Sequence, residues 1–135
     1  MIAVDTSAIV AIALDEPERA SFLRAIQQAR RALISATSVI ETKMVLYGRR
    51  GPPAVVLVED LFRLPMFEIV PPGPADLEAA FGAFVVFGKG SGHPAALNFG
   101  DLFSYALAKV RGLPLLFKGN DFAETDIPPA LAEPA

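Results

Sequence analysis

Residues 1–14, MIAVDTSAIVAIAL, contain one charged side chain, that of Asp5, in a largely apolar run. Residues 2–5 have the length and composition of a short buried strand, and residues 6–16 continue with the apolar spacing of a helix. Burying a carboxylate is costly in free energy unless another group compensates its charge. The place of Asp5, between a predicted strand and a predicted helix, therefore needs a chemical explanation.

The same alternation of short apolar strands and helices continues along the chain. Further strands are predicted at residues 32–35, 67–70 and 113–117, and further helices at residues 16–31, 36–50, 53–64, 75–88 and 101–112. Strands that alternate with helices favour parallel pairing, so we expect an α/β sandwich with helices on both faces of the sheet. The Pro-rich tail, residues 127–135, is expected to fray or to add a brief edge strand.

The size and hydropathy of the chain indicate one domain, residues 1–135. Its 135 residues fit a single core, since cores usually extend to about 100–150 residues before a chain divides. No stretch approaches the roughly 20 apolar residues of a membrane helix, and no signal-peptide pattern precedes the first apolar run. We therefore expect a soluble, cytoplasmic protein without membrane association.

Composition excludes several kinds of site. The chain has no cysteine, which removes disulfides, thiolate zinc sites and cysteine nucleophiles. Its net charge is −3 and its pI about 5.1, so it lacks the basic balance that often marks a nucleic-acid-binding protein. A polyanion would have to bind through a local basic patch or a metal ion.

Four acidic residues fall near the carboxyl ends of the predicted strands, where open parallel sheets bind their ligands. Asp5 ends the first strand, and Glu41 lies in the helix that follows the second. Asp101 begins the helix that leads into the fourth strand, and Asp121 follows that strand. The fold should gather these four carboxylates although they are far apart in sequence.

Local structure offers another explanation for each acid. Asp5 is a favoured N-cap residue, and Asp121 in GND suits a turn. Asp101 stands three residues after Asn98, which is the spacing of a helix-capping pair. Glu41 also has two interpretations, and its position relative to the helix start separates them. Taken singly, these local roles compete with a functional one.

Two serines can start the helix that contains Glu41. If Ser38 is the cap, Ser38 and Glu41 form a capping box at the helix start. If Ser35 is the cap, Glu41 lies beyond the first turn and can face the cleft. The sequence leaves both alternatives open.

Taken together, the four acids indicate a metal site. Two unit charges about 4 Å apart repel by roughly 4 kcal/mol at an effective dielectric constant of 20, so a cleft with several carboxylates needs a cation. Oxygen ligands without cysteine suit one or two Mg²⁺ or Mn²⁺ ions rather than zinc. A metal ion held by carboxylates at an open sheet edge is suited to the hydrolysis of a phosphodiester.

Four segments of the chain resemble the PIN-domain ribonucleases that serve as VapC toxins of toxin–antitoxin modules. They are IAVDTSAIVAIALDEPE (residues 2–18), ISATSVIET (34–42), FGKGSGHPAALNFGDLFSYALAK (87–109) and LPLLFKGNDFAETDI (113–127). The resemblance implies a PIN-like three-layer α/β/α sandwich with a parallel sheet of four to five strands. It also implies an endoribonuclease that depends on Mg²⁺ or Mn²⁺, whose catalytic and metal-binding residues are Asp5, Glu41, Asp101 and Asp121.

The resemblance also implies partners. RNA, often transfer RNA, is the expected substrate and is cut at restricted sites. A homodimer is expected, and residues 44–62 carry more apolar side chains than one helix face can bury, so we expect the interface there. A cognate antitoxin is expected to occlude the site and to bind DNA itself, so this chain is not expected to bind DNA directly.

Other polar residues have weaker claims to function. Ser7 can bond an acid or a metal-bound water, but a helix-start hydroxyl is the commoner role. His93, the single histidine, more often orders a loop of this kind than serves as a general base. Basic residues that could contact an RNA backbone, but that are typical of a solvated surface, are Lys43, Arg49, Arg50, Lys89 and Lys118.

Two other functions compete with the nuclease. A phosphoryl-accepting receiver domain uses an aspartate at a strand end and a lysine after the last strand, a place that Lys118 could take. Its acceptor aspartate should end the third strand, where this chain has EIVPPG, residues 68–73. A catalytically silent PIN-like binding module would be signalled by a missing acid, and all four acids are present.

Overall fold

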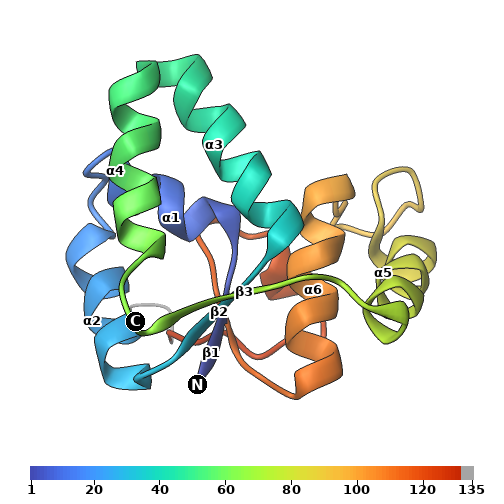
Figure 1. Ribbon diagram of the computed structural model, residues 1–135. Coiled ribbons are helices and arrows are strands. Elements are labelled where there is room, and N and C mark those ends of the chain that lie inside the picture. Colours follow the sequence, from blue (N-terminus) through green and yellow to red (C-terminus); the bar gives the residue numbers. More distant parts are fainter. Residues whose placement is uncertain (132–135) are drawn as a thin grey trace.

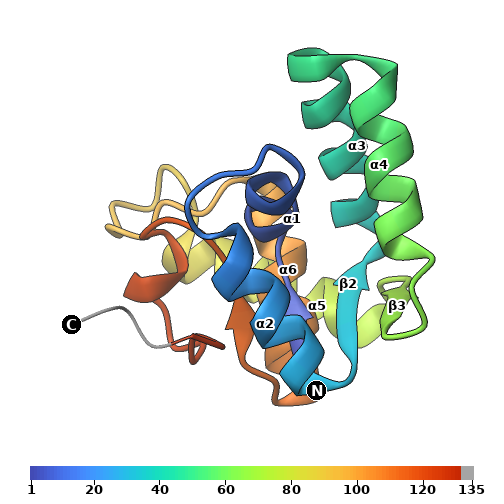
Figure 2. The same ribbon diagram turned by 90° about the vertical axis from the view of Figure 1, so that its left-hand side faces the viewer.

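The computed structural model describes residues 1–131, which form a parallel four-stranded sheet with helices on both faces (Figures 1 and 2). In chain order the elements are β1 (Ile2–Val4), α1 (Thr6–Ala13), α2 (Arg19–Ala29), β2 (Ala32–Ser35), α3 (Ala36–Arg50), α4 (Pro52–Phe62), β3 (Phe67–Val70), α5 (Pro74–Phe87), α6 (Phe99–Arg111), β4 (Leu115–Leu116) and a short 3₁₀ turn (Phe122–Glu124). The predicted α/β/α sandwich with four to five parallel strands is confirmed.

The order of the strands places the first strand at the centre of the sheet. The order is β3-β2-β1-β4, and every strand pair is parallel. The chain therefore moves outward from β1 through β2 to β3 and then returns to the other side of β1 as β4. In such sheets the reversal of strand order opens a crevice beyond the carboxyl ends of the strands, here those of β1 and β4.

Two apolar cores lie on opposite faces of the sheet, and β1 alternates between them. Val4 packs with Ile9 and Ile26 in the core that α1, α2, α3 and α4 cover. Ala3 packs with Leu107 in the core that α5 and α6 cover. Figure 1 shows α5 and α6 on one side of the strands and α1 and α2 on the other. This alternation with a period of two is what a strand buried on both faces requires.

Some predicted boundaries are wrong by several residues. Helix α1 ends at Ala13 rather than at residue 16, because Asp15 adopts a left-handed backbone conformation (φ 53°) that cannot continue a right-handed helix. Helix α2 begins at Arg19, so Pro17 precedes the helix instead of lying in its first turn. The fourth strand is shorter than the predicted residues 113–117.

The beginning of the Pro-rich tail pairs with the sheet. A single parallel bridge joins Pro129 to Leu115 of β4, and the N–H of Ala130 donates to the carbonyl of Leu115 at 2.8 Å. The predicted edge pairing is thus present over a very short length, and residues 132–135 of the tail lie outside the described residues. Within residues 1–131, none of the helices has the length and apolar character needed to cross a membrane.

Helices α3 and α4 form a hairpin that extends away from the sheet, as both views show (Figures 1 and 2). Gly51 turns the chain between them with a positive φ of 74°, and Pro52 occupies the start of α4. The base of α3 begins directly after β2, at the carboxyl edge of the sheet. The first turns of α3 are therefore the part of the hairpin that can contribute to a site at this edge.

A buried ion pair fastens α5 to α6 on the opposite face. The guanidinium of Arg111 donates to Asp76 at 2.6 Å, and the N–H of Gly73 donates to the same carboxylate at 2.8 Å. The hydrogen bond from Arg111 holds the pKa of Asp76 below its ordinary value despite burial. Both oxygens of the Asp76 carboxylate thus accept hydrogen bonds from within the fold.

Replacing Asp76 with alanine should destabilise the protein. The change leaves Arg111 without its partner, and breaking a buried pair costs about 3–5 kcal/mol, which we reduce to about 2–4 kcal/mol because the Arg111 side chain is 27% exposed. Urea unfolding at pH 7 measures the difference. Asp60→Ala is the matched control, because its pair with Arg63 is exposed and should contribute about 0–1 kcal/mol.

The pH dependence of this difference has a definite sign. Because the folded-state pKa of Asp76 is lowered, its contribution is full above the ordinary aspartate value of 3.8 and is lost as pH falls through the folded-state value. The difference in the free energy of unfolding between the parent protein and Asp76→Ala should therefore become smaller below about pH 4. A gap that is the same at pH 7 and in acid would contradict the electrostatic account.

Candidate active site

An open cavity of about 350 Å³ lies at the carboxyl edge of the sheet. Its walls come from the start of α1, one face of α3, the start of α6 and the segment after β4. The lining residues are Asp5, Thr6, Ser7, Val10, Glu16, Glu41, Val45, Arg49, Asn98, Asp101 and Lys118. Three of the four predicted acids thus share one cavity.

Asp5 lines this cavity and is buried, with 3% of its surface exposed. It is the N-cap of α1, and one carboxylate oxygen accepts the backbone N–H of Ser7 at 3.0 Å. The other oxygen accepts the hydroxyl of Ser104, from the second turn of α6, at 2.5 Å. The capping role expected for Asp5 is present, and it coexists with a place in the cavity.

Glu41 faces the same cavity from α3. That helix begins at Ala36 with Ser35 in the N-cap position, so Glu41 lies beyond the first turn. The alternative capping box that starts at Ser38 is therefore wrong; the hydroxyl of Ser38 lies 3.3 Å from that of Ser104 instead. The carboxylate of Glu41 rests against Gly100 in the first turn of α6.

Asp101 occupies the third position of α6 in a reciprocal capping box. Its N–H donates to the Asn98 side chain at 2.9 Å, and its carboxylate accepts the N–H of Asn98 at 3.0 Å. Burial raises the pKa of Asp101 to about 7, and the nearby carboxylates of the three other candidate acids also raise it, against the opposing hydrogen bond from Asn98. The negative charges of Asp5, Glu41 and Asp121 therefore all act on the carboxyl group of Asp101.

Asp121 lies at the rim and does not line the cavity. It precedes the 3₁₀ turn Phe122–Glu124, is exposed, and makes no side-chain cap bond. Its connection to the cavity is the electrostatic effect of its charge on Asp101. The fold thus places three predicted acids in the cavity and the fourth beside it.

Comparison with known proteins identifies the family. The family model described as "PIN domain" matches residues 2–128. The chain belongs to the PIN-domain family. VapC ribonuclease Mb0625 of Mycobacterium bovis and ribonuclease VapC28 of Mycobacterium tuberculosis are each 44% identical over 128 residues, which cover 95% of this chain and 96% of the relative. Ribonuclease VapC42 of M. tuberculosis is 40% identical over 127 residues, covering 94% and 97%. The resemblance to VapC toxins is therefore confirmed.

Solved structures agree on the fold. M. tuberculosis VapC20, described as a sarcin-ricin loop cleaving toxin, has a TM-score of 0.76 at 19% identity, covering 94% of this chain and 96% of its own. A toxin–antitoxin complex from Klebsiella pneumoniae has a TM-score of 0.67 at 17% identity, covering 91% of each chain. At these identities the likeness shows a shared PIN fold. The match to the PIN-domain model over residues 2–128 removes the receiver-domain alternative.

The cationic side chains of this PIN domain are mostly engaged. Lys118 is 3.1 Å from Glu16 and from Glu18, and Lys43 is 3.3 Å from Glu59. Within residues 1–131 no ion pair includes Arg49, which lines the cavity two turns along α3 from Glu41. Arg49 is therefore the cation of the cavity wall that is available to a phosphate.

Two further predictions concern Ser7 and His93. The hydroxyl of Ser7 accepts the backbone N–H of Lys118 at 2.9 Å, which ties the start of α1 to the segment after β4. His93 orders its loop, as expected: its Nδ1 accepts the N–H of Ala95 at 3.1 Å, and its ring packs edge-on against Phe87. His93 is not among the residues that line the cavity.

Sequence reasoning missed Ser104, which is fully buried and donates to Asp5. A signal was available, because Ser104 stands one turn after Asp101 on a predicted helix and so shares its face. The spacing could indicate a face but could not indicate Asp5 as the acceptor.

The donor set fits a hard divalent ion that keeps part of its water. Carboxylate oxygens are the ligands that Mg²⁺ and Mn²⁺ prefer. Within residues 1–131, however, no group of three acidic or histidine side chains is placed to hold one ion between them. Mg²⁺ commonly takes one or two carboxylates and retains several waters. Two cavity carboxylates with water fit such an ion, and ligation by all four acids stays a prediction.

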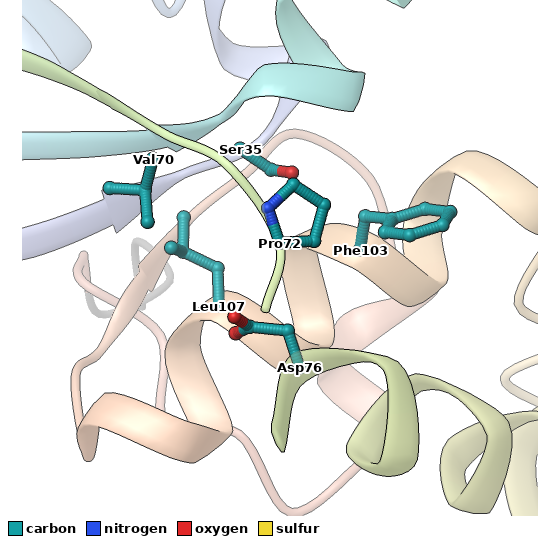
Figure 3. A pocket seen from close by; sticks show the side chains of 6 residues that line it. All are labelled: Ser35, Val70, Pro72, Asp76, Phe103 and Leu107. Carbon is teal, nitrogen blue, oxygen red and sulfur yellow. The ribbon is translucent and has the colours of Figure 1, made fainter. Parts of the chain in front are cut away.

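A second hollow lies apart from the acids, between the end of β3 and helices α5 and α6 (Figure 3). Ser35, Val70, Pro72, Phe103 and Leu107 surround it with Asp76, and it has no room for a water molecule. Because Asp76 is already paired with Arg111, this hollow offers no free reactive group. The open cavity therefore stays the candidate site.

Proposed function

We propose that this PIN domain is a metal-dependent endoribonuclease, the toxin of a type II toxin–antitoxin system, that acts in the cytoplasm. One observation carries the proposal: Asp5, Glu41 and Asp101 share an open cavity at the switch point of a parallel sheet. Burial, and after it the charges of Asp5, Asp121 and Glu41, raise the pKa of Asp101 to about 7. The ribonuclease names of relatives at 40–44% identity support the same activity.

Two of the three cavity carboxylates, those of Asp5, Glu41 and Asp101, would hold the ion together with water, and the third would complete the negative field with Asp121 at the rim. When bound, a divalent cation supplies charge for the phosphate oxygens and acidifies an attacking water. The side chains position this chemistry: Ser104 and the Ser7 N–H fix Asp5, and Asn98 fixes Asp101. The cavity opens to solvent, so an RNA strand can enter with a phosphate near the acids and another near Arg49.

Removing a charge from the cavity should separate activity from stability. We expect Asp5→Asn and Asp101→Asn each to lower RNA cleavage in Mg²⁺ or Mn²⁺ by roughly 100-fold or more, since even groups that only support metal ligands cost about 10–100-fold. Without metal at pH 8, Asp101→Asn should melt at the same or a higher temperature, because like charges no longer repel.

Cleavage of an oligonucleotide RNA with and without EDTA, beside melting curves, tests both parts. Glu78→Gln, an exposed carboxylate on α5, is the matched control and should behave like the parent protein. Cleavage that survives EDTA and both cavity substitutions would overturn the metal-nuclease proposal and return Asp5 to a capping role, whereas a parent protein that cleaves no RNA in Mg²⁺ or Mn²⁺ would favour a silent binding module. We further propose transfer RNA as the target, which sequencing of RNA ends from expressing cells would distinguish from ribosomal RNA.

We propose a cognate antitoxin that places an arginine among the cavity acids. A guanidinium bonds carboxylates through two parallel N–H groups and can stand in for the charge of the metal. The partner should copurify as a small protein and reduce cleavage to background. Replacing that arginine with alanine should restore cleavage while the complex persists; full cleavage in the presence of saturating partner would contradict the idea.

We also propose a homodimer that uses the α3–α4 hairpin. Large apolar side chains there are exposed, with Met44 at 68%, Tyr47 at 62%, Val56 at 57% and Leu57 at 51%. Exposed apolar patches beyond a few hundred Å² usually mark an interface. Such a surface is better covered by a second copy of the hairpin than left in water.

Light scattering at tens of micromolar should give the mass of a dimer, and Val56→Glu should reduce it to that of a monomer. Phe81→Glu on α5, where the side chain is 68% exposed, is the matched control and should leave the dimer intact. Dissociation by Phe81→Glu alone would move the interface to α5, and a monomeric parent protein would remove the proposal.

A further inference from the structure

Gly100 lies in the first turn of α6, directly before Asp101 and beneath the side chain of Glu41. A Cβ built on Gly100 would overlap Oε2 of Glu41 and would lie 2.6 Å from its Cδ and 2.7 Å from its Oε1. Real Cβ atoms essentially never approach a neighbour to less than 3.0 Å. The carboxylate of Glu41 therefore occupies the space that any other residue at position 100 would fill.

Backbone geometry does not explain this glycine. Gly51 and Gly112 have positive φ angles, a conformation that favours glycine. Gly100 lies within α6 and does not have a positive φ angle. Two other glycines within helices, Gly48 and Gly82, have open space where a Cβ would stand, with no atom within 4 Å. Among the helical glycines Gly48, Gly82 and Gly100, Gly100 is the one at which a neighbouring side chain excludes a Cβ, and that neighbour is Glu41.

We propose that Gly100 is a positioning residue, whose missing side chain lets the carboxylate of Glu41 lie against α6 beside Asp101. Glu41 comes from α3 and Asp101 from α6, so the contact at Gly100 brings acids of two different helices to one ion. A methyl group there displaces the Glu41 carboxylate from Asp101. The inference rests on the proposed function for the identity of the ion and on the contact geometry for the role of the glycine.

The substitution should disturb the site without unfolding the protein. The atoms that a methyl group would meet are at the far end of a flexible, half-buried side chain, and not in the backbone. Rotation of Glu41 relieves the overlap at little cost, and alanine favours the helix. A residue with a structural role alone would show the opposite pattern, with lower stability and unchanged binding of metal.

The experiment is a double-mutant cycle on the full chain, read by Mn²⁺ binding without RNA and by melting without metal. We expect Gly100→Ala to weaken Mn²⁺ binding by about 10-fold or more, as loss of ligand support commonly does, with an unchanged or higher melting temperature. In a Glu41→Ala background the same change should alter Mn²⁺ binding by less than about 2-fold, because no carboxylate remains to be displaced. Gly82→Ala is the matched control and should bind Mn²⁺ as the parent does.

The other outcomes are equally clear. If Gly100→Ala binds Mn²⁺ like the parent, or weakens binding equally with and without Glu41, the positioning role is overturned while the proposed function stands. If the parent protein binds no Mn²⁺, both fail together. If Gly100→Ala does not fold, folding of the double variant with Glu41→Ala still locates the contact at Glu41, and a double variant that also fails to fold overturns it.

Discussion

The position of the Asp5 carboxylate is the constraint on which the site depends. It follows the central strand, and donors hold it from two sides: the N–H of Ser7 at the start of α1 and the hydroxyl of Ser104 on α6. The first bond is local and comes from helix capping. The second joins residues that are 99 positions apart and fixes α6 against the end of β1. The two bonds together set where α6, and with it Asp101, meets the sheet.

Two buried or partly buried aspartates show how differently the fold treats negative charge. Asp76 receives Arg111 and the N–H of Gly73, and its pKa is lowered. Burial, and after it the carboxylates that Asp101 faces, raise the pKa of Asp101 to about 7 against the hydrogen bond that it accepts from the N–H of Asn98. The same fold that satisfies one carboxylate leaves the other short of positive charge. A deficit of this kind at an open cavity is typical of functional sites.

Much of this architecture could be predicted from the sequence, because it depends on local patterns. The strand and helix types, the capping pair of Asn98 and Asp101, and the cap at Asp5 follow from residue spacing. Helix ends were harder to place, since the left-handed conformation of Asp15 has no clear signature in its neighbours. Fine boundaries depend on tertiary packing that a pattern does not contain.

The candidate site was likewise predictable in its residues but not in its geometry. Strand order places Asp5 at the switch point only once β4 is known to return beside β1. The bond from Ser104 and the contact of Glu41 with Gly100 depend on how two helices pack, which no spacing reveals.

Capping and catalysis, which compete as explanations in the sequence, are compatible in the structure. An ionised carboxylate offers about four lone-pair directions, and a cap uses only one or two of them. The cap fixes the side chain in one orientation, and the remaining directions stay available to a cation. Asp5 is the N-cap of α1 and Asp101 is the N3 residue of the capping box of α6, so both carboxylates are already oriented for the proposed ion. Glu41 has no cap and depends on the space above Gly100, which makes it the acid whose orientation the packing of α3 against α6 controls.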